Sequence, residues 1–192
     1  MNSAKDWHVC FEIGLNHLGD FKNISNILEV IKKSKNNCAL TVQIREEDFY
    51  KEGKDHLRLD LEEYLELRKR CLDLNIQFGL ALGPLEDLDW IANSGLDPDF
   101  LKLLGIASNN LDFIDAVSKS FSCPKFFSVG LSSIEFVHNS IAPRMSENDG
   151  FIHTSLSHAS EDQNLVQIKL LKSLGKPVFF GQHSSTPAIC YA

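Results

Sequence analysis

Short apolar runs of the kind that form buried strands recur along the whole chain, and this recurrence limits the fold more than any other feature. The runs begin about 25 to 40 residues apart, which is the spacing of one strand–helix unit. The seven runs are residues 9–13, 39–44, 76–82, 100–104, 125–129, 151–154 and 178–180. The chain is therefore expected to alternate between strands and connecting helices.

The connecting segments carry helical patterns. Apolar residues recur at i, i+3, i+4 and i+7 in residues 24–31, and residues 64–74 show a similar stripe behind an acidic first turn. Proline near the start and glycine past the end predict a helix over 84–95, and another is expected over 164–174 with Gly175 as its stop. Continuous apolar strands between amphipathic helices predict a parallel sheet.

Polar side chains follow nearly every predicted strand. In a closed (β/α)₈ barrel these ends converge on one rim, whereas in an open doubly wound sheet they spread along an edge. The sequence contains neither the glycine-rich dinucleotide loop nor the P-loop that would support the open-sheet alternative. We therefore predict an α/β fold of the TIM-type barrel class, with residues 1–192 forming one barrel domain.

The predicted barrel is incomplete, with about seven strand–helix units. Residues 184–187 resemble an N-cap and the first turn of a seventh helix, and Ala192 is reached before an eighth strand. Seven strands cannot close a barrel by themselves. The expectation is that the barrel is completed in another way, that its sheet has an open edge, or that the chain is a fragment; an open edge would favour a homo-oligomer.

The composition excludes several classes of protein. The chain has 192 residues, 43% of them hydrophobic, and a formal charge of −7, which argues against a nucleic-acid or anionic-membrane surface. Its five scattered cysteines have no Cys-x-x-Cys spacing and suggest neither disulfides nor a zinc site, so a reducing cytoplasm is expected. No apolar run approaches the roughly 18 to 20 residues of a membrane span.

Glu12 is an unusual residue because it interrupts the first apolar strand. A carboxylate in that place loses hydration unless a partner compensates it. Such positions are enriched in acid–base or ligand-orienting groups, and the plainer interpretation is a buried Glu paired with a Lys or Arg.

Residues 12–20 read Glu-Ile-Gly-Leu-Asn-His-Leu-Gly-Asp and resemble the strand-one motif Glu-Ile-Gly-x-Asn-His-x-Gly-Asp of the sialic acid synthases, the N-acetylneuraminate, pseudaminic and legionaminic acid synthase group. Further resemblances follow in order at the predicted strand ends, over essentially the whole chain. They lie at Gln43, 100–103, 127–132, 152–155 and 181–184.

The resemblance implies an enzyme of carbohydrate biosynthesis. Such enzymes join phosphoenolpyruvate to an N-acetylated aminosugar such as N-acetylmannosamine, release phosphate and use a divalent metal, Mn²⁺ or Mg²⁺. By this resemblance Glu12 would be the catalytic carboxylate and His183 one of two metal ligands. The implied substrate-binding residues are Asn16, His17, Arg45, Lys102, Ser128 and His153.

The sequence departs from the family pattern at several site positions. The strand-two lysine is replaced by Thr41, although Arg45 could return a cation. Other departures are Ala81, Gly105, Leu156 or Ser157, and Gln182. In that family the second metal histidine belongs to strand eight, and the C-terminal antifreeze-like domain of many members is expected to be absent here. A second function therefore stays open, that of a non-catalytic relative that binds a sugar, an anion or a protein partner.

Each implied site residue also has a structural alternative. Lys102 could serve as the ion-pair partner of Glu12, and His183 could cap a helix. Asn16 and His17 could hold the turn before Gly19. Ser128 could act as a helix cap, and His153 could be a hydrogen-bonded interior histidine. The sequence leaves these alternatives open.

Overall fold

The chain forms one sheet of seven parallel strands in sequential order, as its computed structural model shows for residues 9–33, 37–51 and 53–184. The strands lie within two residues of the predicted apolar runs. Their bounds are β1 Val9–Ile13, β2 Cys38–Ile44, β3 Gln77–Leu82, β4 Phe100–Leu103, β5 Lys125–Ser128, β6 Gly150–Thr154 and β7 Val178–Gly181. The prediction of a sequential parallel sheet is confirmed.

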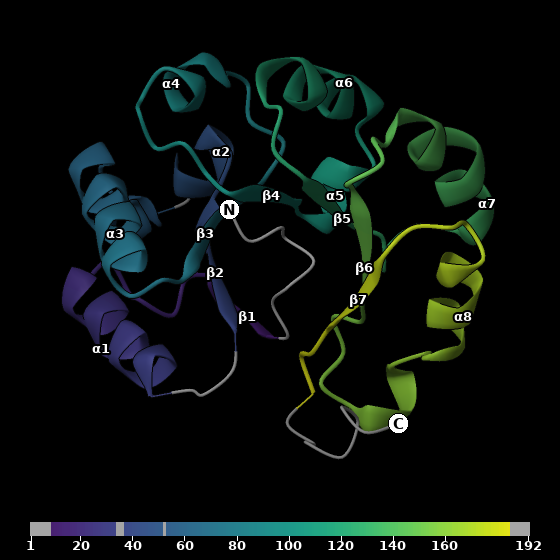
Figure 1. Ribbon diagram of the computed structural model, residues 1–192, viewed down its shortest axis with the longest axis horizontal. Helices are drawn as coiled ribbons and strands as arrows, with labels where there is room; N and C mark the ends of the chain where they lie inside the picture. Colours follow the sequence, from purple (N-terminus) through teal and green to yellow (C-terminus); the bar gives the residue numbers. More distant parts are fainter. Residues whose placement is uncertain (1–8, 34–36, 52, 185–192) are drawn as a thin grey trace.

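The sheet curls on itself and carries its helices on the outer side (Figure 1). Within the described residues β1 and β7 are the two edges, and each strand between them pairs with both sequence neighbours. This is the arrangement of an incomplete TIM-type barrel, so the predicted fold class is confirmed. The N-cap and first turn expected at 184–187 fall mostly outside the described residues.

The helices connect successive strands. The longer ones are α1 Phe21–Lys32, α3 Leu61–Asp73, α6 Leu111–Ser120 and α8 Val166–Lys172, and the shorter ones are α2 Glu47–Lys51, α4 Asp89–Ala92, α5 Gly105–Ser108 and α7 Ile134–Phe136. Single turns lie at η1 Asp55–Leu57, η2 Val137–Ile141, η3 Ala142–Arg144 and η4 Ser160–Asp162. No helix in the described part of the chain is long and apolar enough to span a membrane.

The predicted stripes of α1 and α3 face the sheet. Ile24, Leu28 and Ile31 of α1 are buried, as are Tyr64, Leu67 and Cys71 of α3. The first turn of α3 is closed by a capping box in which Asp60 accepts from the backbone N–H of Glu63 and Glu63 accepts from that of Asp60.

Two helices are shorter than the sequence predicts. The helix expected over 84–95 is reduced to α4, because Asp87 Oδ1 accepts from the N–H of Asp89 at 2.7 Å and holds the preceding residues in a turn. The helix expected from Asn164 begins at Val166, because Asn164 has a φ of 44°, outside the right-handed helical region. Gly175, with a φ of 74°, follows this helix as predicted.

The two faces of the sheet pack differently. Outward side chains such as Leu40, Phe78 and Phe127 join the helices in one large apolar core. Inward side chains form a smaller cluster of Ala39, Phe100, Phe126 and Ile152, with Cys10 and Phe179 packed against it. Because strand residues alternate between faces, this inner cluster defines which residues point into the half-barrel.

Gly130, in the loop after β5, lies against the end of β6. A Cβ atom at this position would lie 1.6 Å from the carbonyl oxygen of Thr154, a backbone atom. Gly175 offers a contrast, because a Cβ atom there would meet nothing within 4 Å and would only strain its φ of 74°.

We predict that Gly130→Ala destabilises the fold much more than Gly175→Ala. The clash at Gly130 should cost about 3 kcal/mol or more, because the loop backbone must move away from the end of β6. The strain at Gly175 should cost about 1–2 kcal/mol. Urea unfolding followed by circular dichroism measures both changes, and an equal loss in the two variants would contradict the close contact between Gly130 and the end of β6.

Candidate functional site

Three polar side chains meet on the inner wall near the carboxyl ends of β1, β2 and β4. Glu12 pairs in register with Thr41, and Lys102 pairs with Ala81, which itself pairs with Gln43. The alternation of the strands therefore places Glu12, Gln43 and Lys102 on the inward face, above the apolar inner cluster. We call these three residues the inner polar group.

Glu12 is held on both of its oxygens. Lys102 Nζ forms an ion pair with Oε2, and Gln43 Nε2 donates to Oε1 at 2.5 Å. The side chain of Glu12 is 28% exposed and that of Lys102 is 14% exposed. The ion pair joins residues on the first and fourth strands, so it ties the curled sheet across its interior.

The inner polar group keeps Glu12 ionised. Burial alone would raise its pKa, but the nearby charge of Lys102 and hydrogen bonds from Lys102 and Gln43 outweigh this effect. The charge of His183 acts in the same direction, and the net result is a pKa below the usual value for glutamate. At neutral pH Glu12 is thus a carboxylate that can accept a proton or a hydrogen bond.

Cys10 lies two residues before Glu12 and packs against the inner cluster. Burial raises the pKa of its thiol to about 12, although the charge of Lys102 opposes the rise. A thiol with this pKa stays protonated and is a poor nucleophile. The chemistry of the inner wall therefore belongs to the carboxylate and the ammonium group.

Ser128 provides an unused hydroxyl on the same wall. It ends β5 two residues after Phe126, and Phe126 pairs with Lys102, so Ser128 and Lys102 share the inner face of neighbouring strands. Its Oγ is buried and has no hydrogen-bond partner within the described residues. Buried hydroxyls are normally satisfied, so this one is available to a ligand at the barrel mouth.

His183 follows β7 at the opposite edge of the sheet. It is exposed, its carbonyl oxygen accepts from His158 Nδ1 at 2.7 Å, and its charge reaches Glu12. Residue 183 therefore lies close enough to Glu12 for its charge to affect the ionisation of that carboxylate.

The described residues do not by themselves form a metal centre. They contain no group of three or more His, Cys, Asp or Glu side chains that could hold a metal ion. Both oxygens of Glu12 are engaged by Lys102 and Gln43, so in the described residues a divalent ion could bind this carboxylate only by competing with them.

His17 is used within the turn after β1. It is buried, its Nδ1 accepts from the N–H of Gly19 at 3.1 Å, and its carbonyl oxygen accepts from Asn23 Nδ2. Burial lowers the pKa of this imidazole, with the charge of Glu63 opposing the shift. These contacts are the ones expected if His17 holds the turn. Asn16 beside it is exposed.

Arg45 and His153 are not brought to the inner polar group. The Arg45 guanidinium binds Glu46 through Nε at 3.1 Å and lies over the ring of Phe49; its hydrogen bond and charge lower the pKa of Glu46 despite partial burial. His153 alternates with the inward Ile152, so it lies on the outward face. There it bonds the carbonyl oxygen of Gln163 at 2.8 Å and stacks on Phe180.

Gln43 is the member of the inner polar group that was not among the predicted site residues. Its place at the end of β2 could be read from the sequence, but its bond to Glu12 depends on the register between β1 and β2. The period-two pattern of strands, which places residues 41 and 43 on one face, was the available signal.

The fold and the inner polar group define a TIM-type barrel domain with its candidate site at the carboxyl ends of the strands, where barrel enzymes carry their active sites. The structure resembles three solved proteins. They are N-acetylneuraminic acid (sialic acid) synthetase from Leptospira borgpetersenii, with TM-score 0.78 and 23% identity; a putative spore coat polysaccharide biosynthesis protein E from Chromobacterium violaceum, with TM-score 0.78 and 15% identity; and the spore coat polysaccharide biosynthesis protein spsE from Bacillus subtilis, with TM-score 0.77 and 18% identity.

These matches cover 95%, 93% and 94% of this chain, which spans 66%, 59% and 54% of the respective structures. No family model and no curated protein matches the sequence. The likeness predicted from the strand-end motifs is thus confirmed at the level of the fold.

We predict that the Glu12–Lys102 pair behaves as a coupled unit in stability. Lys102→Met should lower the free energy of unfolding by about 2–4 kcal/mol, because it leaves a half-buried carboxylate without its counter-charge. The double variant Glu12→Gln/Lys102→Met should recover most of this loss, since it removes both charges. Urea unfolding of both single variants and the double variant measures the coupling, and additive losses would contradict a direct pair.

The same pair predicts that the free energy of unfolding falls in acid. Because the folded state lowers the pKa of Glu12 below its ordinary 4.5, the pair stabilises the fold above that pH. The stabilisation is lost as the pH falls through the lowered pKa. Unfolding measured between neutral pH and pH 3 should therefore show a steeper acid loss in the unaltered chain than in Glu12→Gln/Lys102→Met, and parallel curves would contradict this.

Proposed function

We propose that this chain is a barrel domain of the sialic acid synthase type, which binds phosphoenolpyruvate and condenses it with an N-acetylated aminosugar in carbohydrate biosynthesis. The observation that carries the proposal is the meeting of Glu12, Gln43 and Lys102 at the barrel mouth. The fold shared with a sialic acid synthetase and with spore coat polysaccharide biosynthesis proteins supports the same assignment.

Anion binding is assigned to Lys102 and Ser128. Lys102 supplies a positive charge on the inner wall, and the buried hydroxyl of Ser128 on the next strand can donate to a phosphate or carboxylate oxygen. The anion must compete with Glu12 for the ammonium group, because the two are paired in the structure.

Proton transfer is assigned to Glu12. In the condensation, C3 of phosphoenolpyruvate forms a bond to the sugar aldehyde carbon, and water adds at C2. One proton of that water ends on the aldehyde oxygen. The C2–O bond to phosphate breaks as C2 becomes a carbonyl, and the second proton leaves with the phosphate. An ionised carboxylate can accept the proton of that water, and a lowered pKa keeps Glu12 in the required form at neutral pH.

A second candidate is a non-catalytic domain that binds an anion or a sugar. The specific observation in its favour is that the ion pair and the bond from Gln43 already occupy both oxygens of Glu12. Positions 41, 81 and 105 also carry Thr, Ala and Gly rather than the polar groups of the resembled family. Losing a preorganised contact costs about 10²–10³ in rate, so several losses leave little activity.

Phosphate release separates the two candidates. The purified chain is incubated with phosphoenolpyruvate, N-acetylmannosamine and Mn²⁺, and released phosphate is measured against the variant Glu12→Gln. The synthase proposal predicts release that requires both substrates and that falls at least about 10²-fold in Glu12→Gln. Release no greater than in the variant would overturn it in favour of the binding domain.

Calorimetric titration with phosphoenolpyruvate tests the anion site independently of turnover. Ser128→Ala should weaken binding by about 10-fold, roughly the loss of one hydrogen bond to a charged group, while leaving stability nearly unchanged because the hydroxyl has no protein partner among the described residues. Lys119 is an exposed lysine on α6, so Lys119→Met is the matched charge control for Lys102→Met in this titration. Equal binding by Ser128→Ala and the unaltered chain would exclude Ser128 from the site.

A further inference from the structure

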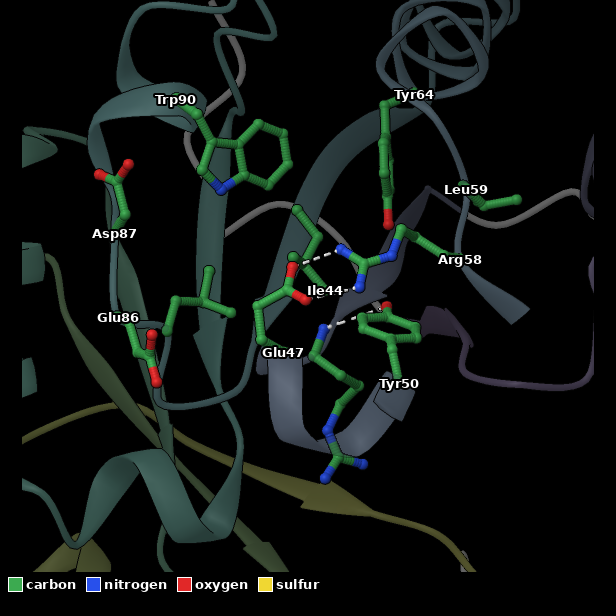
Figure 2. A pocket seen from close by; sticks show the side chains of 11 residues that line it. Ile44, Glu47, Tyr50, Arg58, Leu59, Tyr64, Glu86, Asp87 and Trp90 are labelled. Carbon is green, nitrogen blue, oxygen red and sulfur yellow. Dashed lines mark hydrogen bonds and ion pairs between the residues drawn. The ribbon is translucent and has the colours of Figure 1, made fainter. Parts of the chain in front are cut away.

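A cavity of about 280 Å³ lies outside the barrel, between the β2–α3 connection and the loop that follows β3 (Figure 2). The β2–α3 connection comprises α2, η1 and the residues that lead into α3. The cavity is lined by Ile44, Arg45, Glu47, Tyr50, Arg58, Leu59, Tyr64, Leu85, Glu86, Asp87 and Trp90. Ile44 alternates with the inward Gln43, so this cavity and the inner polar group lie on opposite faces of β2.

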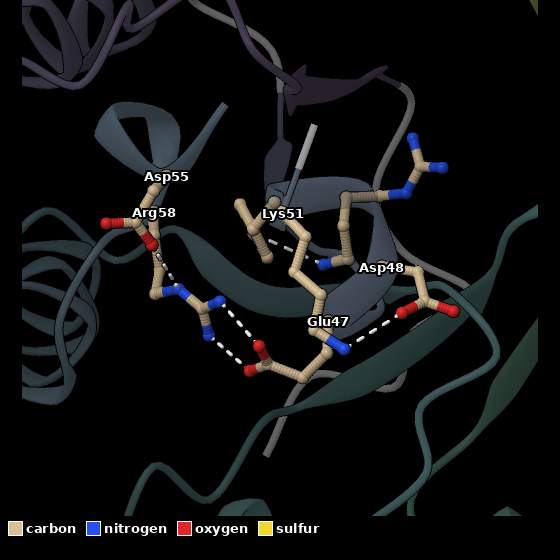
Figure 3. Close-up of polar contacts among 7 residues, drawn as sticks. Glu47, Asp48, Lys51, Asp55 and Arg58 are labelled. Atoms are coloured by element: carbon tan, nitrogen blue, oxygen red, sulfur yellow. Dashed lines mark hydrogen bonds and ion pairs between the residues drawn. The ribbon is translucent and has the colours of Figure 1, made fainter. Parts of the chain in front are cut away.

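One wall is built on a fixed carboxylate–guanidinium pair. Both oxygens of Glu47 accept from Arg58, at 2.6 and 2.9 Å, and Asp55 lies 3.4 Å from Arg58 Nε (Figure 3). Lys51 binds Asp48 at 3.0 Å in the same β2–α3 connection. Exposed pairs of this kind add at most about 1 kcal/mol each, so their effect is to position side chains rather than to stabilise the fold.

Three aromatic residues line the same cavity, and of these Trp90 is the exposed one while Tyr50 and Tyr64 are buried. Trp90 is 39% exposed and its ring points toward the space between the two loops in Figure 2. The guanidinium carbon of Arg58 lies over the ring of Tyr50, 4.2 Å from the ring centre. The Tyr50 hydroxyl accepts from the N–H of Arg45 at 3.4 Å. Tyr64 donates to the carbonyl oxygen of Gln43 at 3.2 Å, and burial raises its pKa, so this hydroxyl stays protonated.

The charges of the lining disfavour an ionic ligand. Glu47, Glu86 and Asp87 oppose an anion, while Arg45 and Arg58 oppose a cation. A hydroxyl group, by contrast, both donates and accepts, so it can bond a carboxylate and a guanidinium that already face each other. Aromatic surface beside such a pair suits a ring with an apolar C–H face and hydroxyls at its edge.

We propose that this cavity is a binding site for a neutral sugar, one pyranose ring in size, separate from the site at the barrel mouth. Its volume is near the lower end of small-molecule sites, about 300 Å³, which limits the occupant to a single ring. In the complex the sugar packs against Trp90 and its hydroxyls bond Glu47 and Arg58. The proposal does not depend on the condensing activity proposed above.

Nuclear magnetic resonance titration of the full chain tests this site with named probes. Methyl β-glucoside and N-acetylglucosamine, added in the millimolar range, should shift the indole N–H signal of Trp90 and the backbone signals of residues 45–50 and 85–90. Trp90→Ala should weaken binding by at least about 10-fold, equal to about 1.4 kcal/mol, and Trp90→Phe should retain most of it. Leu72→Ala, which removes an exposed apolar side chain from α3 away from the cavity lining, is the matched control and should bind as the unaltered chain does.

Other outcomes would overturn the proposal. No shift with either sugar, or equal binding by Trp90→Ala, Trp90→Phe and the unaltered chain, excludes a sugar site at Trp90. Shifts produced by tetramethylammonium or inorganic phosphate but not by the sugars would assign the cavity to a cation or an anion. The variant Glu12→Gln should leave the titration unchanged, so failure here is distinguishable from failure of the proposed condensation.

Discussion

The ion pair between Glu12 and Lys102 is the interaction on which the inner wall depends. The wall beneath it is apolar, built by Ala39, Phe100 and Phe126, and a single charge above that surface would be costly without a counter-charge. Pairing across β1 and β4 removes this cost and draws the curled sheet together. The outer face needs no such ion pair, because helices cover it with a continuous apolar core.

The proposed function makes conflicting demands on the two residues of this pair. A synthase needs Lys102 for an anion and Glu12 for a proton, yet each satisfies the other in the structure. Ser128 offers the compensating element, since its unpartnered buried hydroxyl lies on the next strand within the described residues. An anion that gains both Lys102 and Ser128 can displace one oxygen of Glu12, whose other oxygen stays bonded to Gln43.

The outer cavity shows how a barrel can carry a second site without disturbing the first. Its walls come from connections between strands, and the inner polar group comes from the strands themselves. Gln43 and Ile44 are neighbours in β2 but point to opposite sides, so one strand end contributes to both. The two sites can therefore be altered separately.

The pattern of residues along the chain was enough to predict the parallel α/β architecture, because apolar runs of strand length at regular spacing have few ways to bury both faces. It also identified Glu12 as a carboxylate in need of a partner and offered Lys102 as one candidate. It could not place His153, since one residue of register decides whether a strand side chain faces the barrel or the helices, and here it faces outward, against Phe180.

The contacts between segments distant in the sequence depend on how the chain folds in three dimensions. The bond from Gln43 to Glu12 joins residues 31 apart, and the pair with Lys102 joins residues 90 apart. The cavity beside Trp90 depends on the turn made by Asp87, which shortens the predicted helix and opens the loop after β3. Local patterns specify elements, whereas such sites arise from how the elements meet in space.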